Sequence, residues 1–263
     1  MAKYPDTHSK YPVTPKAYPA APKVYPGTVA SYPGTASAAV TPLTILGSLA
    51  WWVRSDLGIT IDTNVSGWAD QSGNGVNFAQ AVGSAQPTLV AGVLNGCDAV
   101  RFINPFDDNM TAAWVRVAPG TQPFYVWSVF TQISWTLNQC VLSDATATGF
   151  ALRARTGSPE LRMANATLVN ANSAAAVGTP VRCEMQFTNS TSDYLKIIST
   201  NTTGASAGNL AGSGTMYLGS NAGGLNYAHI DLYEAFVFLG TPSAGQRAEL
   251  DTYCTGRYGA GLV

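Results

Sequence analysis

Two carboxylates in one apolar stretch are the residues best placed for acid–base chemistry. Asp231 and Glu234 lie in the string His229-Ile-Asp-Leu-Tyr-Glu234, whose apolar residues indicate a strand. Retaining glycoside hydrolysis uses two carboxyl groups about 5–5.5 Å apart on either side of the sugar bond. In a regular strand, residues three apart face opposite sides of the sheet. Unless a bulge intervenes, this spacing argues against a catalytic pair, and we expect no catalytic residue in the chain.

A second group of oxygen-bearing side chains occurs in the run Gly67-Trp-Ala-Asp-Gln-Ser-Gly-Asn-Gly75. Asp70, Ser72 and Asn74 alternate as ligands do around calcium, but the run lacks the closing Glu and the 12-residue register of a calcium loop. The same side chains can bond to nearby backbone N–H groups, while the glycines accept positive φ. We therefore interpret the run as a tight corner that satisfies its own backbone, with no metal.

The other reactive side chains form no recognisable site. His8 and His229 are the only histidines, which argues against a histidine metal centre or a Ser-His-Asp triad. No GxxxxGK[ST] string is present to hold a phosphate, so no cofactor is expected. The four cysteines are far apart in the sequence without a CxxC pair, and we expect them to be reduced and structural.

Composition favours a β-rich body with a neutral surface. The 263 residues are 46% hydrophobic but only 11% charged, well below the usual quarter of a globular chain. Residues 1–42 carry four lysines and one aspartate, a net charge of +3, so the remainder carries −4. This balance predicts no nucleic-acid partner. The apolar runs are too short for a membrane span, and the start Met1-Ala-Lys-Tyr-Pro predicts no signal peptide.

Alternating and apolar runs predict several strands. The runs with the strongest signal are Phe124–Phe130, Val181–Phe187, Tyr194–Ile198, Thr215–Leu218 and Ile230–Leu239. In Val181–Phe187 the alternation places Arg182, Glu184 and Gln186 outward. One helix is predicted after Ser243, because Ser243 and Gln246 form a capping box.

The N-terminal segment 1–42 repeats the dipeptide Tyr-Pro with a period of seven residues. Each proline fixes its own φ and holds the preceding tyrosine extended, which predicts a polyproline-like arm rising about 3.1 Å per residue. A disordered spacer is the alternative, but a spacer needs no tyrosine at fixed intervals. We expect the arm to bind a partner through its tyrosines and lysines, which are Tyr4, Tyr11, Tyr18, Tyr25, Tyr32, Lys3, Lys10, Lys16 and Lys23.

The body, residues 43–263, resembles a known family at both ends. The strand with Trp51 and the pair Ser55-Asp56, followed by W-x-D-x-S-G-N-G, is similar to the opening of laminin-G-like domains of the concanavalin A-like class. The closing strand Asp231–Phe238 and the helix after it resemble the end of such domains. The resemblance implies an all-β antiparallel jelly-roll sandwich with one C-terminal helix, preceded by the extended arm.

The same resemblance bears on carbohydrate chemistry. Glycosidases of this fold carry Glu-x-Asp-x-x-Glu on a strand, and here His229 stands where their nucleophile would be, so the resemblance implies no glycosidase activity. Sugar binding stays open, because exposed aromatics beside Asn and Asp are typical of sugar sites. The candidates are Trp114, Trp135, Tyr227 and the Asn221–Asn226 loop, although aromatics of this kind more often belong to the core.

A jelly roll on a repetitive arm is similar to virion proteins of tailed bacteriophages. The first expectation is a non-enzymatic capsid decoration protein on the virion surface, assembled in the host cytoplasm. Its partners would be the major capsid protein or other virion proteins, and it would be a homo-oligomer within the particle. The alternatives are a tail-fibre or receptor-binding module that recognises a host glycan, or a bacterial carbohydrate-binding module.

Overall fold

The computed structural model describes most of the body of the chain. The described residues are 40–114, 123–134, 139–144, 150–154, 161–164, 168–170, 176–188, 193–197, 200–204, 214–221 and 226–262. The chain divides into two compact units, residues 1–35 and 36–263, and every described residue belongs to the second unit.

The first sheet, sheet A, is antiparallel and has β8 (Phe124–Gln132) and β17 (Ile230–Phe238) at its centre. Its order is β15-β14-β13-β8-β17-β6-β5. The outer strands are β5 (Thr88–Leu94), β6 (Cys97–Phe102), β13 (Pro180–Phe187), β14 (Asp193–Ile197) and β15 (Thr200–Gly204). The first half of β17 pairs with β6, and its second half pairs with β1 (Trp51–Arg54).

The second sheet, sheet B, has the order β12-β11-β10-β9-β16-β7-β4-β3-β2. Its strands are β2 (Ile59–Ile61), β3 (Val65–Trp68), β4 (Phe78–Ala79), β7 (Met110–Ala113), β9 (Cys140–Asp144), β10 (Ala151–Ala154), β11 (Leu161–Ala164), β12 (Leu168–Asn170) and β16 (Thr215–Leu218). All named strand pairs are antiparallel, so the prediction of an all-β sandwich is confirmed.

The main hydrophobic core lies between the two sheets because the strands alternate as the sequence predicts. In β13, Val181, Cys183, Met185 and Phe187 enter this core from sheet A. Met216 and Leu218 of β16 meet them from sheet B. The rings of Phe124 and Phe187 stack within it, with their centroids 4.4 Å apart.

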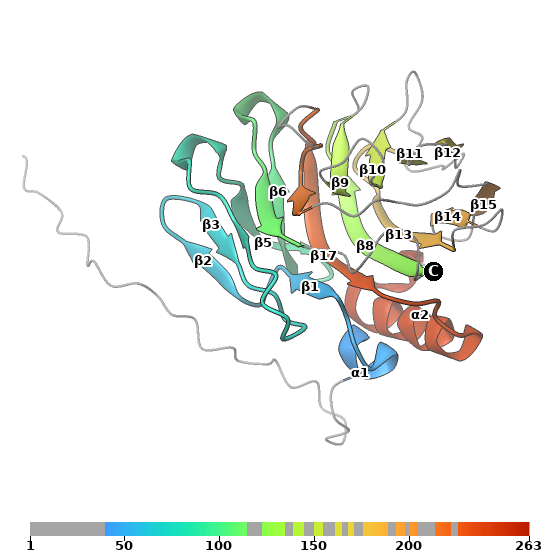
Figure 1. The fold of residues 1–263 in the computed structure, drawn as a ribbon. Helices are drawn as coiled ribbons and strands as arrows, with labels where there is room; N and C mark the ends of the chain where they lie inside the picture. The colour runs from blue at the N-terminus through green and yellow to red at the C-terminus, as the bar shows by residue number, and fades with distance from the viewer. Residues whose placement is uncertain are drawn as a thin grey trace, which may run out of the picture. The chain divides into compact units, whose positions relative to one another are not determined.

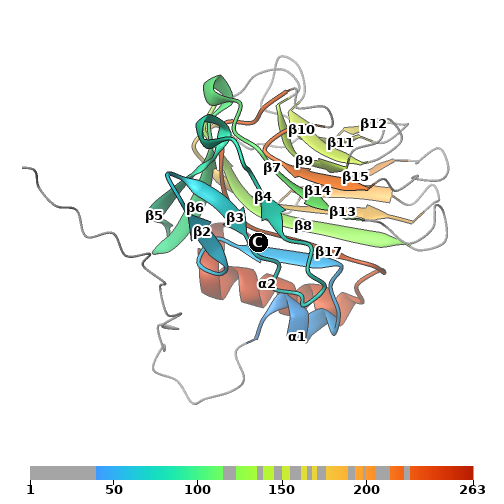
Figure 2. The same ribbon diagram turned by 60° about the vertical axis from the view of Figure 1, so that its left-hand side comes forward.

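A second core lies on the other face of sheet A, under α2 (Ala244–Tyr258). Leu250 and Cys254 of this helix pack against Trp127 and Phe236 of the sheet. The predicted capping box is present, since the Ser243 side chain accepts a hydrogen bond from Gln246 N and the Gln246 side chain accepts one from Ser243 N. Figure 1 shows α2 together with the short helix α1 (Pro42–Leu46) near β1 and β17, and Figure 2 shows the two helices from another side.

Helix α2 changes the surroundings of the side chains that alternation places outward on β13. Arg182, Glu184 and Gln186 do point away from the inter-sheet core, but they are buried, with 1–2% of their surface exposed. Arg182 forms ion pairs with Glu184 and with Asp251 of the helix. Charged side chains are buried in this way only when they are paired, so the outer face of sheet A is here a second interior.

Several smaller features complete the described part of the chain. Three 3-10 turns are present there, η1 (Gly83–Ala85), η2 (Asn104–Phe106) and η3 (Ala260–Leu262). None of the four cysteines is in a disulfide, as expected. Among the described residues, no helix is long and apolar enough to span a membrane.

Candidate functional site

A β-bulge in β17 brings the two candidate carboxylates to the same face of sheet A. The register of β17 against β8 shifts between Leu232 and Glu234. Ile230, Leu232 and Ala235 enter the inter-sheet core, whereas Tyr233 and Phe236 enter the second core. Asp231 and Glu234 therefore both point away from sheet B. Opposite faces were expected for a strand without a bulge, and this expectation does not hold here because the extra residue of the bulge resets the alternation.

Glu234 is engaged in holding helix α2 and strand β1 to the sheet. Its Oε1 accepts hydrogen bonds from Trp52 Nε1 at 2.6 Å and from Tyr253 Oη at 2.9 Å. Its Oε2 accepts from Tyr258 Oη at 2.6 Å. The side chain is fully buried, and this burial raises the pKa of the Glu234 carboxyl above its ordinary value. The Glu234 carboxylate is therefore surrounded by hydrogen-bond donors of the protein and has no contact with solvent, as expected of a structural residue.

Asp231 has a different role, because Arg101 of β6 binds it in a bidentate fashion. Arg101 Nε donates to Asp231 Oδ1 at 2.7 Å, and Arg101 Nη2 donates to Asp231 Oδ2 at 2.8 Å. The hydrogen bond to Asp231 raises the pKa of Arg101, so the guanidinium stays charged. The Arg101 side chain keeps 32% of its surface exposed, whereas that of Asp231 keeps 4%. Such forked pairs fix a carboxylate in one orientation.

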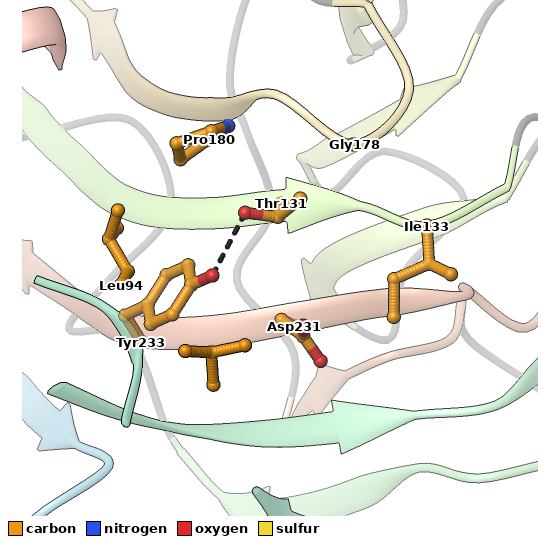
Figure 3. Close-up of a pocket in the computed structure, with 8 residues that line it drawn as sticks. Leu94, Thr131, Ile133, Gly178, Pro180, Asp231 and Tyr233 are labelled. Atoms are coloured by element: carbon orange, nitrogen blue, oxygen red, sulfur yellow. Dashed lines mark hydrogen bonds between the residues drawn. The ribbon is translucent and has the colours of Figure 1, made fainter. Parts of the chain in front are cut away.

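Asp231 opens into a pocket of about 300 Å³ on the face of sheet A that points away from sheet B. The pocket is lined by strands β5, β8 and β17 and by the start of β13, with the residues Val93, Leu94, Thr131, Ile133, Gly178, Pro180, Asp231 and Tyr233. In Figure 3, Tyr233 and Asp231 project from β17 beside Thr131, which comes from β8. The volume of this pocket is at the lower end of the range found for small-molecule binding sites.

The polar part of the pocket consists of the Asp231 carboxylate and a pair of hydroxyls. Thr131 Oγ1 and Tyr233 Oη lie 2.9 Å apart and share one hydrogen bond (Figure 3). Burial raises the pKa of Tyr233, so its phenol keeps its proton. His229 lies two residues before Asp231, and its pKa is lowered by burial and by the charge of Arg101. The neighbourhood of the pocket therefore presents hydroxyls, a carboxylate and a guanidinium.

The corner at Gly67–Gly75 is structural, because its side-chain oxygens are committed to the backbone. Asp70 accepts hydrogen bonds from the backbone N–H groups of Trp52, Ser72 and Val76 and from the Ser72 hydroxyl. Asn74 Nδ2 donates to the carbonyl of Leu49. Among the described residues, no group of three or more His, Cys, Asp or Glu side chains is arranged to hold a metal ion.

The aromatic sugar-site candidates have different surroundings. Trp114 is a core residue, 5% exposed, with its ring edge-on to Phe150, so it is no sugar platform. Tyr227 is partly exposed, and its carbonyl accepts a hydrogen bond from Asn104. Trp135 lies outside the described residues, as does most of the Asn221–Asn226 loop.

The predicted arm anchors also lie outside the described residues. These are Tyr4, Tyr11, Tyr18, Tyr25 and Tyr32 together with Lys3, Lys10, Lys16 and Lys23. Their proposed role stays a prediction. Conversely, sequence reasoning missed Arg101, Thr131 and Tyr233 as site residues. The sequence does contain a signal for Arg101, because this arginine stands between the apolar residues Val100 and Phe102, which are buried in the structure. A charged residue at that position in a strand lies on the face opposite its two neighbours.

Comparison with known proteins shows the fold. No family model and no curated protein matches the sequence. Among solved structures, a GH54 α-L-arabinofuranosidase soaked with a cyclic sulfate inhibitor aligns with a TM-score of 0.53 and 18% identity, over 75% of this chain and 51% of the enzyme. Domain 4 of AbnA, a GH43 extracellular arabinanase from Geobacillus stearothermophilus, in complex with arabinotriose, aligns with a TM-score of 0.56 and 11% identity, over 77% of this chain and 98% of that domain.

A third neighbour is the binding domain of Paraclostridial Mosquitocidal Protein 1, with a TM-score of 0.56 and 10% identity over 80% of this chain and 53% of that one. The chain thus spans about half the length of the arabinofuranosidase and of the toxin binding domain. At 10–18% identity these likenesses show the fold alone, which is a β-sandwich.

Proposed function

We propose that the folded body is a non-catalytic carbohydrate-binding module and that the pocket beside Asp231 is its ligand site. The observation that carries the proposal is the composition of this pocket. A carboxylate fixed by Arg101 and a hydroxyl pair lie next to aliphatic side chains. Sugars combine hydroxyl groups with apolar C–H faces, so a site for them needs both kinds of surface within one small cavity.

The carboxylates favour binding over hydrolysis. Glycoside hydrolysis needs two carboxyl groups that flank one sugar bond. Asp231 is the one carboxylate among the residues that line the pocket, and Glu234 is fully buried against Tyr253 and Tyr258 of α2. Glu234 cannot reach a bound sugar unless the helix leaves the sheet.

Two of the structural neighbours support this choice. Domain 4 of AbnA is described in complex with arabinotriose, and the alignment covers 98% of that domain. The third neighbour is the binding domain of a mosquitocidal protein. Because the sequence identities are only 10–11%, these neighbours support carbohydrate binding as a class of function but point to no residues. The candidate residues come from the pocket beside Asp231.

The test is retention on neutral polysaccharides, compared between the full chain and two matched variants. Asp231→Asn keeps the size of the side chain but removes its charge and one of the two acceptors of the forked pair with Arg101. Hydrogen bonds to charged groups contribute about 1.5–3 kcal/mol, so affinity should fall roughly 10- to 100-fold. Asp62→Asn makes the same change at an exposed residue and should leave affinity unchanged.

Thr131→Val supplies a second variant in case Asp231→Asn fails to fold. A panel on which the wild type shows no retention, or retention that both pocket variants keep in full, would contradict the proposal. Steady release of reducing sugar would contradict its non-catalytic part.

A second proposal concerns the arm. Five Tyr-Pro dipeptides with a constant period of seven favour a repeated contact with a regular partner. This supports a role as a virion structural protein on the particle surface, with the arm bound to a capsid or other virion protein and with several copies per particle. A carbohydrate-binding body on such an arm also suits a receptor-binding component of a tail.

A further inference from the structure

The pocket beside Asp231 is divided into a polar floor and an aliphatic rim. Thr131, Asp231 and Tyr233 form the floor, with 9%, 3% and 2% of their surfaces exposed. Val93 at the rim is 40% exposed. The other rim side chains are partly exposed and equally aliphatic, namely Leu94, Ile133 and Pro180. A ligand that is polar at its inner edge and apolar where it touches the rim side chains therefore complements the pocket.

The floor retains hydrogen-bonding capacity after its internal bonds are counted. Each Asp231 oxygen accepts one bond from Arg101 and keeps a further lone pair, which can accept a ligand hydroxyl. In the Thr131–Tyr233 pair, one hydroxyl donates to the other, so one hydroxyl hydrogen remains for a ligand oxygen. Together these groups offer a ligand both an acceptor and a donor of hydrogen bonds.

Among the described residues, the aliphatic side chains of the rim offer no hydrogen-bonding group to a ligand hydroxyl. Val93 and Leu94 belong to β5, and Ile133 directly follows β8. In Figure 3, Leu94 and Ile133 lie on opposite sides of Asp231. A ligand hydroxyl placed against these aliphatic side chains would lose its hydrogen bonds to water and gain none in return. A ligand methyl group placed there would instead remove apolar surface from water on both partners.

We propose that the pocket selects 6-deoxyhexoses, sugars whose sixth carbon is a methyl group. This inference rests on the proposed carbohydrate-binding function and names its ligand class. The sugar places adjacent ring hydroxyls on Asp231 and on the Thr131–Tyr233 pair, and its methyl group lies against the rim. The matching hexose carries a hydroxymethyl group at the same carbon and brings its extra hydroxyl to the rim without a partner.

Two pairs of sugars isolate the methyl group. D-fucose differs from D-galactose, and L-rhamnose from L-mannose, only in lacking the hydroxyl on the sixth carbon. An NMR titration of the full chain with each of the four sugars gives the ratio of affinities within a pair. Apolar pockets discriminate such small changes by roughly 10- to 200-fold. We expect the deoxy sugar to bind about tenfold more tightly in whichever pair binds.

A matched pair of variants ties this preference to the rim. Val93→Thr keeps the β-branched shape but adds a hydroxyl at the rim, and should reduce the preference for the deoxy sugar to less than threefold. Val82→Thr makes the same change at an exposed valine that does not line the pocket, and should leave the preference unchanged. Both valines are exposed, so both variants should fold.

The outcomes separate this inference from the function on which it rests. Equal affinity within both pairs, or tighter binding of the hydroxymethyl sugars, would overturn the choice of ligand class and leave carbohydrate binding in place. A preference that survives Val93→Thr in full would place the methyl group elsewhere and overturn the inference. If neither these sugars nor neutral polysaccharides bind, the proposed function falls with it.

Discussion

Replacing Glu234 with leucine should destabilise the fold strongly, because this one carboxylate joins β17, β1 and α2. It accepts hydrogen bonds from Trp52, Tyr253 and Tyr258 at 2.6–2.9 Å. Glu234→Leu leaves three donors without an acceptor, and each unpaired buried group costs about 1–3 kcal/mol. The loss of the carboxylate's own desolvation penalty offsets part of this cost. We expect the free energy of unfolding to fall by about 3–5 kcal/mol, as when one partner of a buried pair is removed.

The assay is urea unfolding followed by tryptophan fluorescence, with Glu249→Leu as the matched control. Glu249 is exposed on the same helix, so its replacement should change the unfolding free energy by less than about 0.5 kcal/mol. If Glu234→Leu is as mild as Glu249→Leu, the carboxylate does not hold the helix to the sheet and the reasoning is refuted.

The pH dependence gives a second measurement on the same side chain. Burial raises the pKa of Glu234 in the folded state, so the folded protein binds this proton more tightly than the unfolded chain does. The stability that this proton contributes is present below the unfolded-state pKa and is lost as pH rises through the raised value. Measured against Glu234→Gln, which does not titrate, wild-type stability should therefore decline over that interval. A flat difference would contradict the assigned pKa direction.

Three further predictions test the corner and the arm. Asp70→Ala should lower the unfolding free energy by about 2–4 kcal/mol, because it removes the acceptor of four hydrogen bonds at the corner, each worth roughly 1 kcal/mol. On the same grounds, calcium should not raise the melting temperature of the wild type. A calcium-dependent rise would restore the interpretation of this corner as a metal site. Deleting residues 1–40 keeps Thr41, the N-cap of α1, and should leave the melting temperature within a few degrees in a thermal scan, whereas a large drop would show that the arm stabilises the body. Under the proposed role of the arm in a virion, changing Tyr11, Tyr18 and Tyr25 together to alanine should detach the protein from the particle without unfolding it. Wild-type occupancy of particles by this variant would reduce the arm to a spacer.

The sequence predicted those parts of the fold that depend on alternation and caps. The Val181–Phe187 alternation and the Ser243–Gln246 box both correspond to elements of the structure. Helix α1 was missed although Thr41 and Thr44 form a capping box around Pro42, because five residues are too few for a periodic pattern.

The site was less accessible to sequence reasoning. The bulge between Leu232 and Glu234 adds a residue to one strand, and no residue type marks it. Without it, alternation assigns Asp231 and Glu234 to opposite faces. The second core, under α2, could not be predicted from the sequence either. In the sequence Arg182 and Glu184 have the pattern of a solvent-exposed face, and only the packing of α2 over them shows that they are buried. The pocket itself needs β8, β17, β6 and β5 in this order within one sheet, which is a property of topology.

The central claim is that a sugar binds in the pocket beside Asp231, and a crystal structure of the full chain with the sugar that binds best tests it most directly. We expect density for the sugar in the pocket, with ring hydroxyls within hydrogen-bond distance of Asp231 and of Thr131 or Tyr233. Its apolar face should lie against Val93 and Ile133. A sugar seated on another surface, with this pocket filled only by water, would contradict the account.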